Sequence, residues 1–386
     1  MAILLVAVIY AAFISLGLPD SLLGSAWPVM QVELGRALSD AGIVSTIISA
    51  GTIVSSLQSD RVNRKLGTGK VTAISVLTTA VALLGFSVST AFWQLCLWAI
   101  PFGLGAGAVD AALNNYVALH YTSRHMSWLH CFWGVGATIS PYVMGGCLTL
   151  GLGWRMGYRT VGLLQVGLTV VLLVSLPLWK KTVSSTEEPA APSLPLTKLV
   201  ALPGAKQIFI AFLAHCALEH TNALWTSSYL VQYRGVDVET AARFAALSYI
   251  GLTFGRFLCG FVADKLGDRR LIRMGLSMMI LGLALVILPL PTEVALAGLL
   301  ILGFGCAPIY PSIIHSTPAN FGRELSQQVI GVEMASAYVG TTVMPPLFGL
   351  LAQHISIGLF PVFQLTMTLV VLGMSEWMNR IVSHRT

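Results

Sequence analysis

Long apolar runs recur along the whole of this 386-residue chain. Each is about 20 residues or longer, the length that a helix needs to cross a hydrocarbon core about 30 Å thick. Only 10% of the residues are charged and the mean hydropathy is +0.79, whereas a soluble globular chain is about one-quarter charged. Because unbroken apolar runs lack the alternation of barrel strands, we predict an all-α membrane protein.

Twelve transmembrane helices can be placed on this pattern, with one long polar linker between the sixth and the seventh. We expect them at residues 3–31, 38–59, 69–89, 91–118, 125–150, 155–179, 206–232, 239–263, 270–289, 293–318, 324–352 and 356–378. The chain then consists of an N-terminal six-helix bundle (1–180), a cytoplasmic linker (181–205) and a C-terminal six-helix bundle (206–386).

Lysine and arginine gather in the loops on one side of the predicted membrane. About sixteen lie on that side and about five on the other, the excess that marks cytoplasmic loops. We therefore expect both termini in the cytoplasm and a location in the cell (inner) membrane. The same topology accounts for the sequence pI near 9.1, so a nucleic-acid partner is not expected. We expect a monomer in the lipid bilayer.

The two halves of the chain resemble one another at an offset of about 200 residues. Gly103-Leu-Gly105 is echoed by Gly303-Phe-Gly305. The loop after the second span, with Asp60, Arg61, Arg64 and Lys65, is echoed after the eighth span by Asp264, Lys265, Arg269 and Arg270. Internal repeats of this kind are typical of transporters.

The loop after the eighth span resembles a motif of the major facilitator superfamily, G-x-x-x-D-[RK]-x-G-[RK]-[RK]. The matching run is Gly260-Phe-Val-Ala-Asp264-Lys265-Leu-Gly267-Asp268-Arg269-Arg270, which departs from the motif at Asp268. The first copy departs at Ser56 and Asn63, where the motif has glycine. The resemblance implies two pseudo-symmetric six-helix bundles, the major facilitator fold, which rock around a central cavity, with these loop residues acting as a gate. The alternative is that the basic residues only fix the topology.

Acidic side chains lie inside two of the predicted spans. Asp110 and Asn114 are one helical turn apart in the fourth span, and Asp20 lies in the first, on one face with Trp27. A charge at this depth costs several kcal/mol unless it is paired, neutralised or facing water, so such groups indicate a functional site. The alternative is that these polar groups only hold helices together.

The run Asp110-Ala-Ala-Leu-Asn114-Asn115 is similar to the fourth helix of fucose permeases and their relatives. Those proteins are proton-coupled sugar symporters with an acidic residue in the first helix, a position that Asp20 matches here. The run departs from the pattern by carrying Asp110 where glutamate is expected, and Asn115 where proline often follows. The resemblance implies a proton-coupled sugar transporter and leaves the identity of the sugar open.

The seventh span carries His215, Glu219, Asn222 and Tyr229 on one face, with Trp225 beside them. His215 and Glu219 are one turn apart, so they can share a proton; alternatively they only bridge helices. Aromatic rings offer the flat apolar faces that sugar rings require. The side chains that we expect to contact the solute are Trp27, Asn114, His130, Trp133, Asn222, Trp225, Tyr229, Tyr310 and His315.

Two further charged residues, Arg256 and Glu333, lie inside the eighth and eleventh spans. At about 1.5 Å of rise per residue, both are some 12 to 14 Å from the cytoplasmic edge. We expect them to pair as a latch in one conformational state.

The predicted function is secondary active transport of a small polar solute, a sugar by resemblance, coupled to protons by alternating access. Asp20 and Asp110 are the predicted proton carriers, assisted by Glu219 and His215. The alternative is a proton-driven efflux antiporter of hydrophobic or drug-like compounds, because Gly136-x-x-x-Ser140-Pro141 partly resembles the motif of such exporters. The sequence has no catalytic triad, metal-ligand cluster or nucleotide loop, so we expect no enzyme activity, metal or cofactor.

Overall fold

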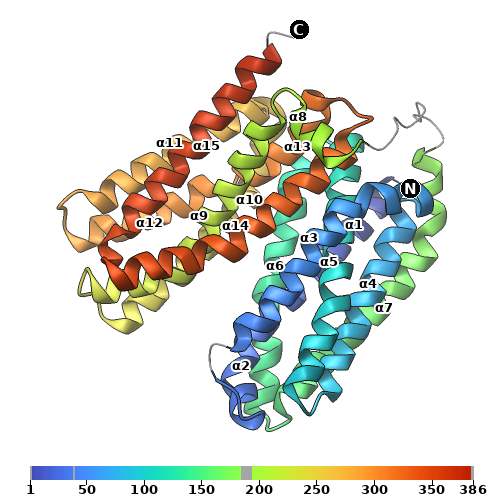
Figure 1. Ribbon diagram of the computed structural model, residues 1–386, viewed down its shortest axis with the longest axis horizontal. Helices are drawn as coiled ribbons and strands as arrows, with labels where there is room; N and C mark the ends of the chain where they lie inside the picture. The colour runs from blue at the N-terminus through green and yellow to red at the C-terminus, as the bar shows by residue number, and fades with distance from the viewer. Residues whose placement is uncertain (1, 38–39, 184–193, 384–386) are drawn as a thin grey trace. The chain divides into compact units, whose positions relative to one another are not determined.

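The computed structural model describes residues 2–37, 40–183 and 194–383, and over these residues every regular element is a helix (Figure 1). The first half of the chain contains α1 (Ala2–Asp20), α2 (Leu22–Glu33), α3 (Ala41–Leu66), α4 (Thr68–Val88), α5 (Phe92–His120), α6 (Ser123–Thr149) and α7 (Gly153–Val183). The remaining elements are α8 (Leu196–Ala201), α9 (Ala205–Gln232), α10 (Val238–Leu266), α11 (Asp268–Ile287), α12 (Thr292–Cys306), α13 (Ile309–Phe321), α14 (Ser326–His354), the 3-10 helix η2 (Ile357–Leu359) and α15 (Phe360–Ser383).

Each predicted span coincides with one of these helices or with two consecutive ones. The first span is broken at Ser21 between α1 and α2, and the tenth at residues 307–308 between α12 and α13. Nine helical segments of the described residues are long and apolar enough to cross a membrane. The long helices α6, α9 and α10 are not among these segments, and they carry the buried histidines, Glu219 and Arg256.

The chain divides into two compact units, one formed by residues 1–116 and 129–193 and the other by residues 117–128 and 194–386. The α5–α6 corner, residues 117–128, therefore groups with the second half of the chain, whereas the predicted boundary kept it in the first. Part of the predicted linker, residues 184–193, lies outside the described residues, and α8 lies in the rest of it.

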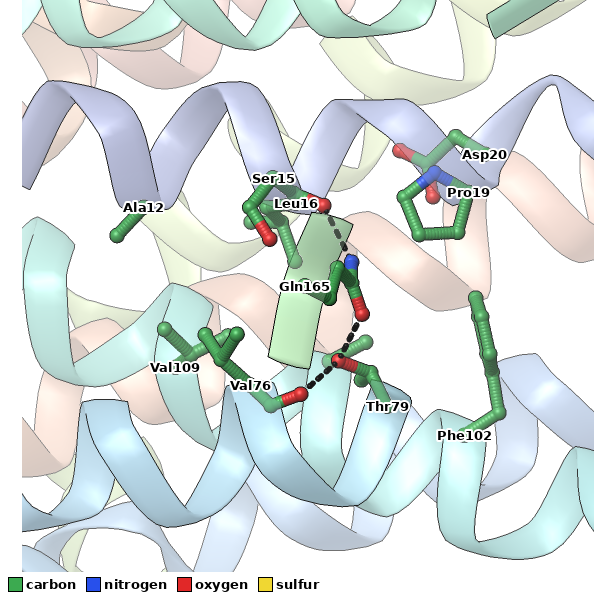
Figure 2. A pocket seen from close by; sticks show the side chains of 11 residues that line it. Ala12, Ser15, Leu16, Pro19, Asp20, Val76, Thr79, Phe102, Val109 and Gln165 are labelled. Atoms are coloured by element: carbon green, nitrogen blue, oxygen red, sulfur yellow. Dashed lines mark hydrogen bonds between the residues drawn. The ribbon is translucent and has the colours of Figure 1, made fainter. Parts of the chain in front are cut away.

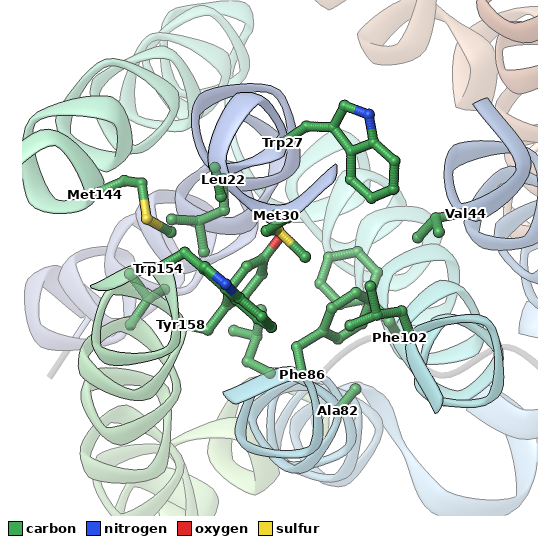
Figure 3. Packing of buried hydrophobic residues seen from close by; sticks show 14 of the residues in the cluster. Leu22, Trp27, Met30, Val44, Ala82, Phe86, Phe102, Met144, Trp154 and Tyr158 are labelled. Atoms are coloured by element: carbon green, nitrogen blue, oxygen red, sulfur yellow. The ribbon is translucent and has the colours of Figure 1, made fainter. Parts of the chain in front are cut away.

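The core of the first unit is aromatic and interlocked (Figure 3). The rings of Phe86 and Tyr158 stack with centroids 5.2 Å apart, and Trp154 lies edge-on to Tyr158. Trp27 is only 2% exposed and packs against Phe92 in the same core. In this structure Trp27 faces the aromatic core, and its predicted contact with the solute stays a prediction.

Glycines bring α1 and α6 together backbone to backbone. A Cβ atom built on Gly17 would lie 2.1 Å from the carbonyl oxygen of Trp133, and one on Gly136 would lie 2.1 Å from that of Ile14. The second unit repeats this contact between α14 and α9, where a Cβ on Gly340 would lie 2.4 Å from the carbonyl oxygen of Leu213. Small residues allow close crossings in membranes, where packing rather than water exclusion holds helices together.

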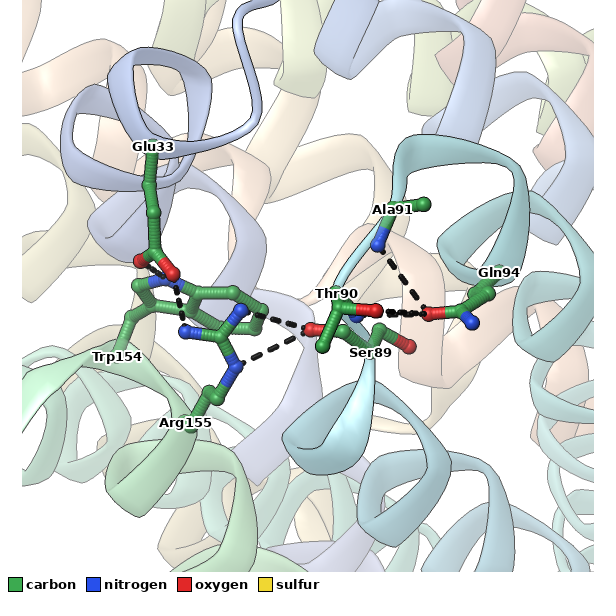
Figure 4. A network of polar contacts seen from close by, with 7 residues as sticks. All are labelled: Glu33, Ser89, Thr90, Ala91, Gln94, Trp154 and Arg155. Carbon is green, nitrogen blue, oxygen red and sulfur yellow. Dashed lines mark hydrogen bonds and ion pairs between the residues drawn. The ribbon is translucent and has the colours of Figure 1, made fainter.

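Polar contacts tie three helix ends together at one edge of the first unit (Figure 4). Arg155 at the start of α7 donates to the carbonyl oxygen of Ser89 at 3.1 and 2.9 Å and also pairs with Glu33 at the end of α2. The Trp154 indole donates to the same Glu33 carboxylate at 2.7 Å. Nearby, the Gln94 side-chain oxygen accepts from the backbone N–H of Thr90 at 2.7 Å. These contacts fix the ends of α2, α4 and α7.

Candidate functional site

The end of α1 is shaped by a proline. Pro19 has no backbone N–H, so the carbonyl oxygen of Ser15, four residues earlier, lacks its helical donor. The Gln165 amide of α7 supplies a donor at 2.7 Å, and its oxygen accepts from the Thr79 hydroxyl of α4 at 2.8 Å (Figure 2). Gln165 and Thr79 were not predicted as site residues; a lone amide in an apolar run was the only local signal.

A small pocket lies beside this bridge, and Asp20, Ser15, Thr79, Gln165 and Phe102 contribute to its wall (Figure 2). The Ser15 hydroxyl is buried and has no hydrogen-bond partner. The enclosed room suits a water molecule rather than a sugar. The pocket is therefore suited to hydrate the polar groups around the end of α1.

Asp20, the last residue of α1, is held from α6. The indole N–H of Trp133 donates to the Asp20 carboxylate at 2.8 Å, and the Ser21 hydroxyl donates to the carbonyl oxygen of Ala137 at 2.9 Å. The close glycine crossing of α1 and α6 makes both contacts possible. Asp20 is exposed at the surface of its unit, and its charge is close enough to that of Asp110 for the two to repel.

Asp110, Asn114 and His130 form one hydrogen-bonded chain inside the first unit. The Asn114 amide donates to the Asp110 carboxylate at 2.8 Å, and its oxygen lies 3.0 Å from Nε2 of His130 on α6. All three side chains are buried, and the imidazole stands edge-on to Phe13. Because an amide oxygen only accepts, His130 donates at Nε2. The predicted shared face of Asp110 and Asn114 is present, and it extends to His130.

The second unit contains a buried ion pair between α9 and α10. Nη2 of Arg256 lies 3.2 and 3.1 Å from the two carboxylate oxygens of Glu219, and Arg256 is 2% exposed. Nε2 of His215 lies 3.5 Å from Glu219, which is long for a hydrogen bond, and neither nitrogen of that fully buried ring has a hydrogen-bond partner. Tyr310, just after the break between α12 and α13, places its ring centroid 5.9 Å from the Arg256 guanidinium carbon.

In this structure Arg256 pairs with Glu219, and the predicted Arg256–Glu333 latch, which concerns one conformational state, stays a prediction. Glu333 is fully buried and accepts hydrogen bonds from the Thr317 hydroxyl at 2.9 and 3.1 Å. The cation instead binds the carboxylate that α9 presents to it, Glu219.

Two aromatic residues predicted to contact the solute, Tyr229 and Trp225, make contacts within the second unit. The Tyr229 side chain is 1% exposed, stacks on Tyr233 and accepts a hydrogen bond from Arg234 at 3.1 Å. The Trp225 indole donates to the carbonyl oxygen of Pro345 at 3.0 Å. The predicted polar face continues at Asn222, whose side-chain oxygen accepts from the Thr226 hydroxyl at 3.0 Å.

His315 was predicted to contact the solute, but the structure places it at the α5–α6 corner. Its Nδ1 lies 2.7 Å from Asp268, and its Nε2 lies 3.2 Å from the carbonyl oxygen of Tyr121. The Ser123 hydroxyl donates to the other Asp268 oxygen at 2.6 Å. Because both neighbours of the ring are acceptors, it must donate from both nitrogens, as only an imidazolium can. Asp268, where the loop sequence departs from its motif, is the centre of this contact.

The loop motif after α10 binds the same corner. Asp264 accepts from the backbone N–H of Arg124 at 3.0 Å, in the first turn of α6, where orphan donors favour a carboxylate. A Cβ on Gly260 would lie 2.1 Å from the Trp128 ring, so only glycine admits that indole, which donates to the carbonyl oxygen of Phe257 at 3.2 Å. The basic residues Lys265, Arg269 and Arg270 are exposed.

The first copy of the loop motif is used differently. Arg64 places Nε 2.9 Å from both carboxylate oxygens of Asp60 on the same helix, α3, and Arg61 donates to the side-chain oxygen of Gln58 at 3.3 Å. Lys65 is exposed. The two copies thus share a sequence pattern, whereas Asp60 pairs within its own helix and Asp264 binds the start of α6.

Apolar helices that bury carboxylates, histidines and an arginine define a multi-pass membrane protein with polar sites inside its helical units. A family model described as Major Facilitator Superfamily matches residues 9–332 and, in a second alignment, 207–378. The chain belongs to this superfamily, and it is a transporter of small-molecule solutes rather than an enzyme.

Similar proteins agree with this assignment. The chain is 24% identical over 349 residues to the cis,cis-muconate transport protein of Acinetobacter baylyi, covering 86% of this chain and 83% of that one. It is 21% identical over 390 residues to the glucose/mannose transporter of Bacillus subtilis, covering 96% and 94%. The crystal structure of the E. coli fucose:proton symporter superposes with a TM-score of 0.76 at 15% identity, covering 98% of each chain. At this identity the structural likeness concerns the fold alone.

Proposed function

We propose that this transporter is a secondary active symporter in the inner membrane, with both termini cytoplasmic, that moves a small polar solute together with protons by alternating access. The observation that carries the proposal is the buried chain of Asp110, Asn114 and His130. A carboxylate, an amide and an imidazole in hydrogen-bonded order can accept, orient and pass a proton in an apolar surrounding.

Asp20 is the second proton carrier in this proposal. It lies beside the small pocket, at the end of α1, where a water molecule can reach it. Asp20 and Asp110 belong to the same unit and are close enough to interact electrostatically. Trp133 holds Asp20 from α6, and His130 is on the same helix, so a solute that contacts α6 would influence both carboxylates.

The names of similar proteins support a polar organic solute. One relative is named for transport of cis,cis-muconate, one for glucose and mannose, and a solved structure is that of a fucose:proton symporter. Sugars and organic acids are both small polar molecules that need a polar path through the membrane.

The test is uptake into proteoliposomes that contain a pH-sensitive dye. We expect an inward proton gradient to drive uptake of the solute, and addition of the solute to carry protons inward. Asp110→Asn should abolish the coupled proton movement, whereas Asp40→Asn, at a surface ion pair with Arg36, should preserve it. Protons that move against the solute would favour the efflux antiporter, and solute movement indifferent to protons would refute coupling.

A further inference from the structure

We propose that the solute carries a carboxylate, and that Arg256 binds this carboxylate in exchange for Glu219. The inference rests on the proposed symport and specifies its substrate class: a small organic monocarboxylate, such as a sugar acid. The structural basis is the Arg256–Glu219 pair with His215 beside it in the second unit.

The ion pair is buried in helices that cross the membrane. A guanidinium at this depth needs an anion, because a buried cation without one is strongly destabilised. Glu219 supplies that anion in this structure. Neutralisation of Glu219 therefore removes this counter-ion from Arg256 and favours the binding of another carboxylate there.

The geometry of the pair differs from the parallel two-point contact that a guanidinium favours. Both oxygens of Glu219 approach the same nitrogen of Arg256, Nη2, at 3.2 and 3.1 Å. A carboxylate that is not tethered to α9 can adopt the parallel two-point contact that the planar guanidinium favours, which gives shorter and stronger hydrogen bonds. The Tyr310 ring lies near the guanidinium, with its centroid 5.9 Å from the guanidinium carbon, and its face favours a cation.

His215 provides a place for Glu219 once it is protonated. The imidazole is fully buried, one turn before Glu219, with no hydrogen bond at either nitrogen. A protonated Glu219 is neutral and can donate its O–H to Nε2, which is already 3.5 Å away. The other titratable groups near Glu219 are His220 and Cys306. His215 is the titratable neighbour on α9 whose ring nitrogen lies 3.5 Å from the carboxylate.

The exchange relates one proton to one solute carboxylate at this buried cluster. One proton neutralises Glu219, and one solute carboxylate replaces it at Arg256, so the net charge of the buried cluster is unchanged. No bond other than the O–H of Glu219 forms or breaks. Counted with the Glu219 proton alone, a monocarboxylate would enter without net charge, and protons carried by Asp20 or Asp110 would add to that charge. A neutral sugar with one proton would carry a positive charge.

The experiment uses D-glucuronate and D-glucose, which share a ring and differ in one carboxylate, together with D-galacturonate and D-galactose as a second pair. Uptake into proteoliposomes is measured under a proton gradient, with membrane voltage set independently by potassium and valinomycin. We expect the sugar acids to be taken up, driven by the proton gradient and less sensitive to voltage than the neutral sugars, with the neutral sugars at least tenfold slower.

Variants separate binding from folding. Glu219→Gln imitates the protonated side chain, so it should bind D-glucuronate at least tenfold more tightly in a thermal-shift titration, with the pH dependence removed. Arg256→Lys should weaken binding at least tenfold, because lysine cannot make the two-point contact.

The double variant Glu219→Gln/Arg256→Gln leaves no unpaired charge, and it should fold without binding the acid. Arg273→Gln, in the exposed ion pair with Glu376, is the control and should bind normally.

The outcomes are distinguishable. If neutral sugars move with protons in a voltage-dependent way while sugar acids neither move nor compete, the carboxylate proposal is overturned and the proposed symport stands. If sugar acids bind equally well to the folded double variant, Arg256 is not their site and the proposal is also overturned. If neither the acids nor the sugars move with protons, both proposals fail together.

Discussion

The side-chain amide of Gln165 donates a 2.7 Å hydrogen bond to the backbone carbonyl oxygen of Ser15. The bond replaces the one that Pro19 cannot make, so a side chain on α7 completes the backbone of α1. The second unit has a related contact, in which the Gln364 amide donates to the carbonyl oxygen of Leu218 at 3.3 Å. Four positions after Leu218, where the first unit has proline, the chain has Asn222. Its backbone N–H can donate the helical hydrogen bond to the Leu218 carbonyl oxygen. Only the first unit therefore needs its glutamine to satisfy a carbonyl.

This difference predicts unequal effects of removing the two amides. Gln165→Leu should lower the free energy of unfolding by about 1–3 kcal/mol, the cost of a buried carbonyl left without a donor. Gln364→Leu should cost less. In a Pro19→Ala background, where the helical N–H returns, the effect of Gln165→Leu should shrink. Thermal unfolding in detergent measures all three, and equal losses with no coupling to Pro19 would contradict the assignment.

The backbone contact between α1 and α6 predicts a sharp contrast between two glycines of α6. Gly136→Ala places a methyl group against the Ile14 carbonyl and should destabilise the protein by about 1–3 kcal/mol or prevent folding. Gly145→Ala meets nothing within 4 Å and should be neutral or slightly stabilising. Stability of the purified variants tests this, and a tolerated Gly136→Ala would show that the helices can separate at little cost.

The chain from Asp110 to His130 predicts that its central amide matters for coupling. Asn114→Leu preserves approximate size but removes both hydrogen bonds, so we expect proton-coupled uptake to fall at least tenfold. Asn114→Gln retains the amide on a longer side chain and should retain part of the activity. The same proteoliposome dye assay reports both, and full coupling in Asn114→Leu would mean that the proton takes another route.

The contacts of His315 predict that the α5–α6 corner depends on an imidazolium. His315→Gln can donate from one nitrogen only, so it should loosen the hold on either Asp268 or the Tyr121 carbonyl. We expect faster cleavage by trypsin at Arg124 in this variant and in Asp268→Asn. His354→Gln, at the end of α14, is the control. Unchanged cleavage in all variants would show that Asp264 alone holds the corner.

The helices themselves could be predicted because hydropathy is local: each predicted span coincides with observed helices. The break near Asp20 could be anticipated from Pro19, but its effect on register could not. Trp27 was placed on the face of Asp20 by continuing a helix that stops at Ser21, and the structure puts it in the aromatic core.

Contacts between distant segments were the part that sequence could not supply. His315 and Asp268 are 47 residues apart, and Ser123 and Asp268 are 145 apart, so no spacing rule connects them. At the offset of about 200 residues between the two halves, His315 corresponds to Asn115 in the polar fourth span. This correspondence suggested a contact with the solute. Likewise, similar depth in the membrane suggested Glu333 as a partner for Arg256. Depth alone does not specify which face of a helix meets which neighbour.

The indole of Trp133 is both the hydrogen-bond donor to Asp20 and a fluorophore. Emission from an indole responds to the charge and polarity at its N–H, so a change at this carboxylate alters the light that the ring gives off. The difference in emission between the protein and its Trp133→Phe variant isolates that one ring from the other tryptophans. The molecule thus carries a built-in optical probe beside Asp20, readable in real time without any attached dye.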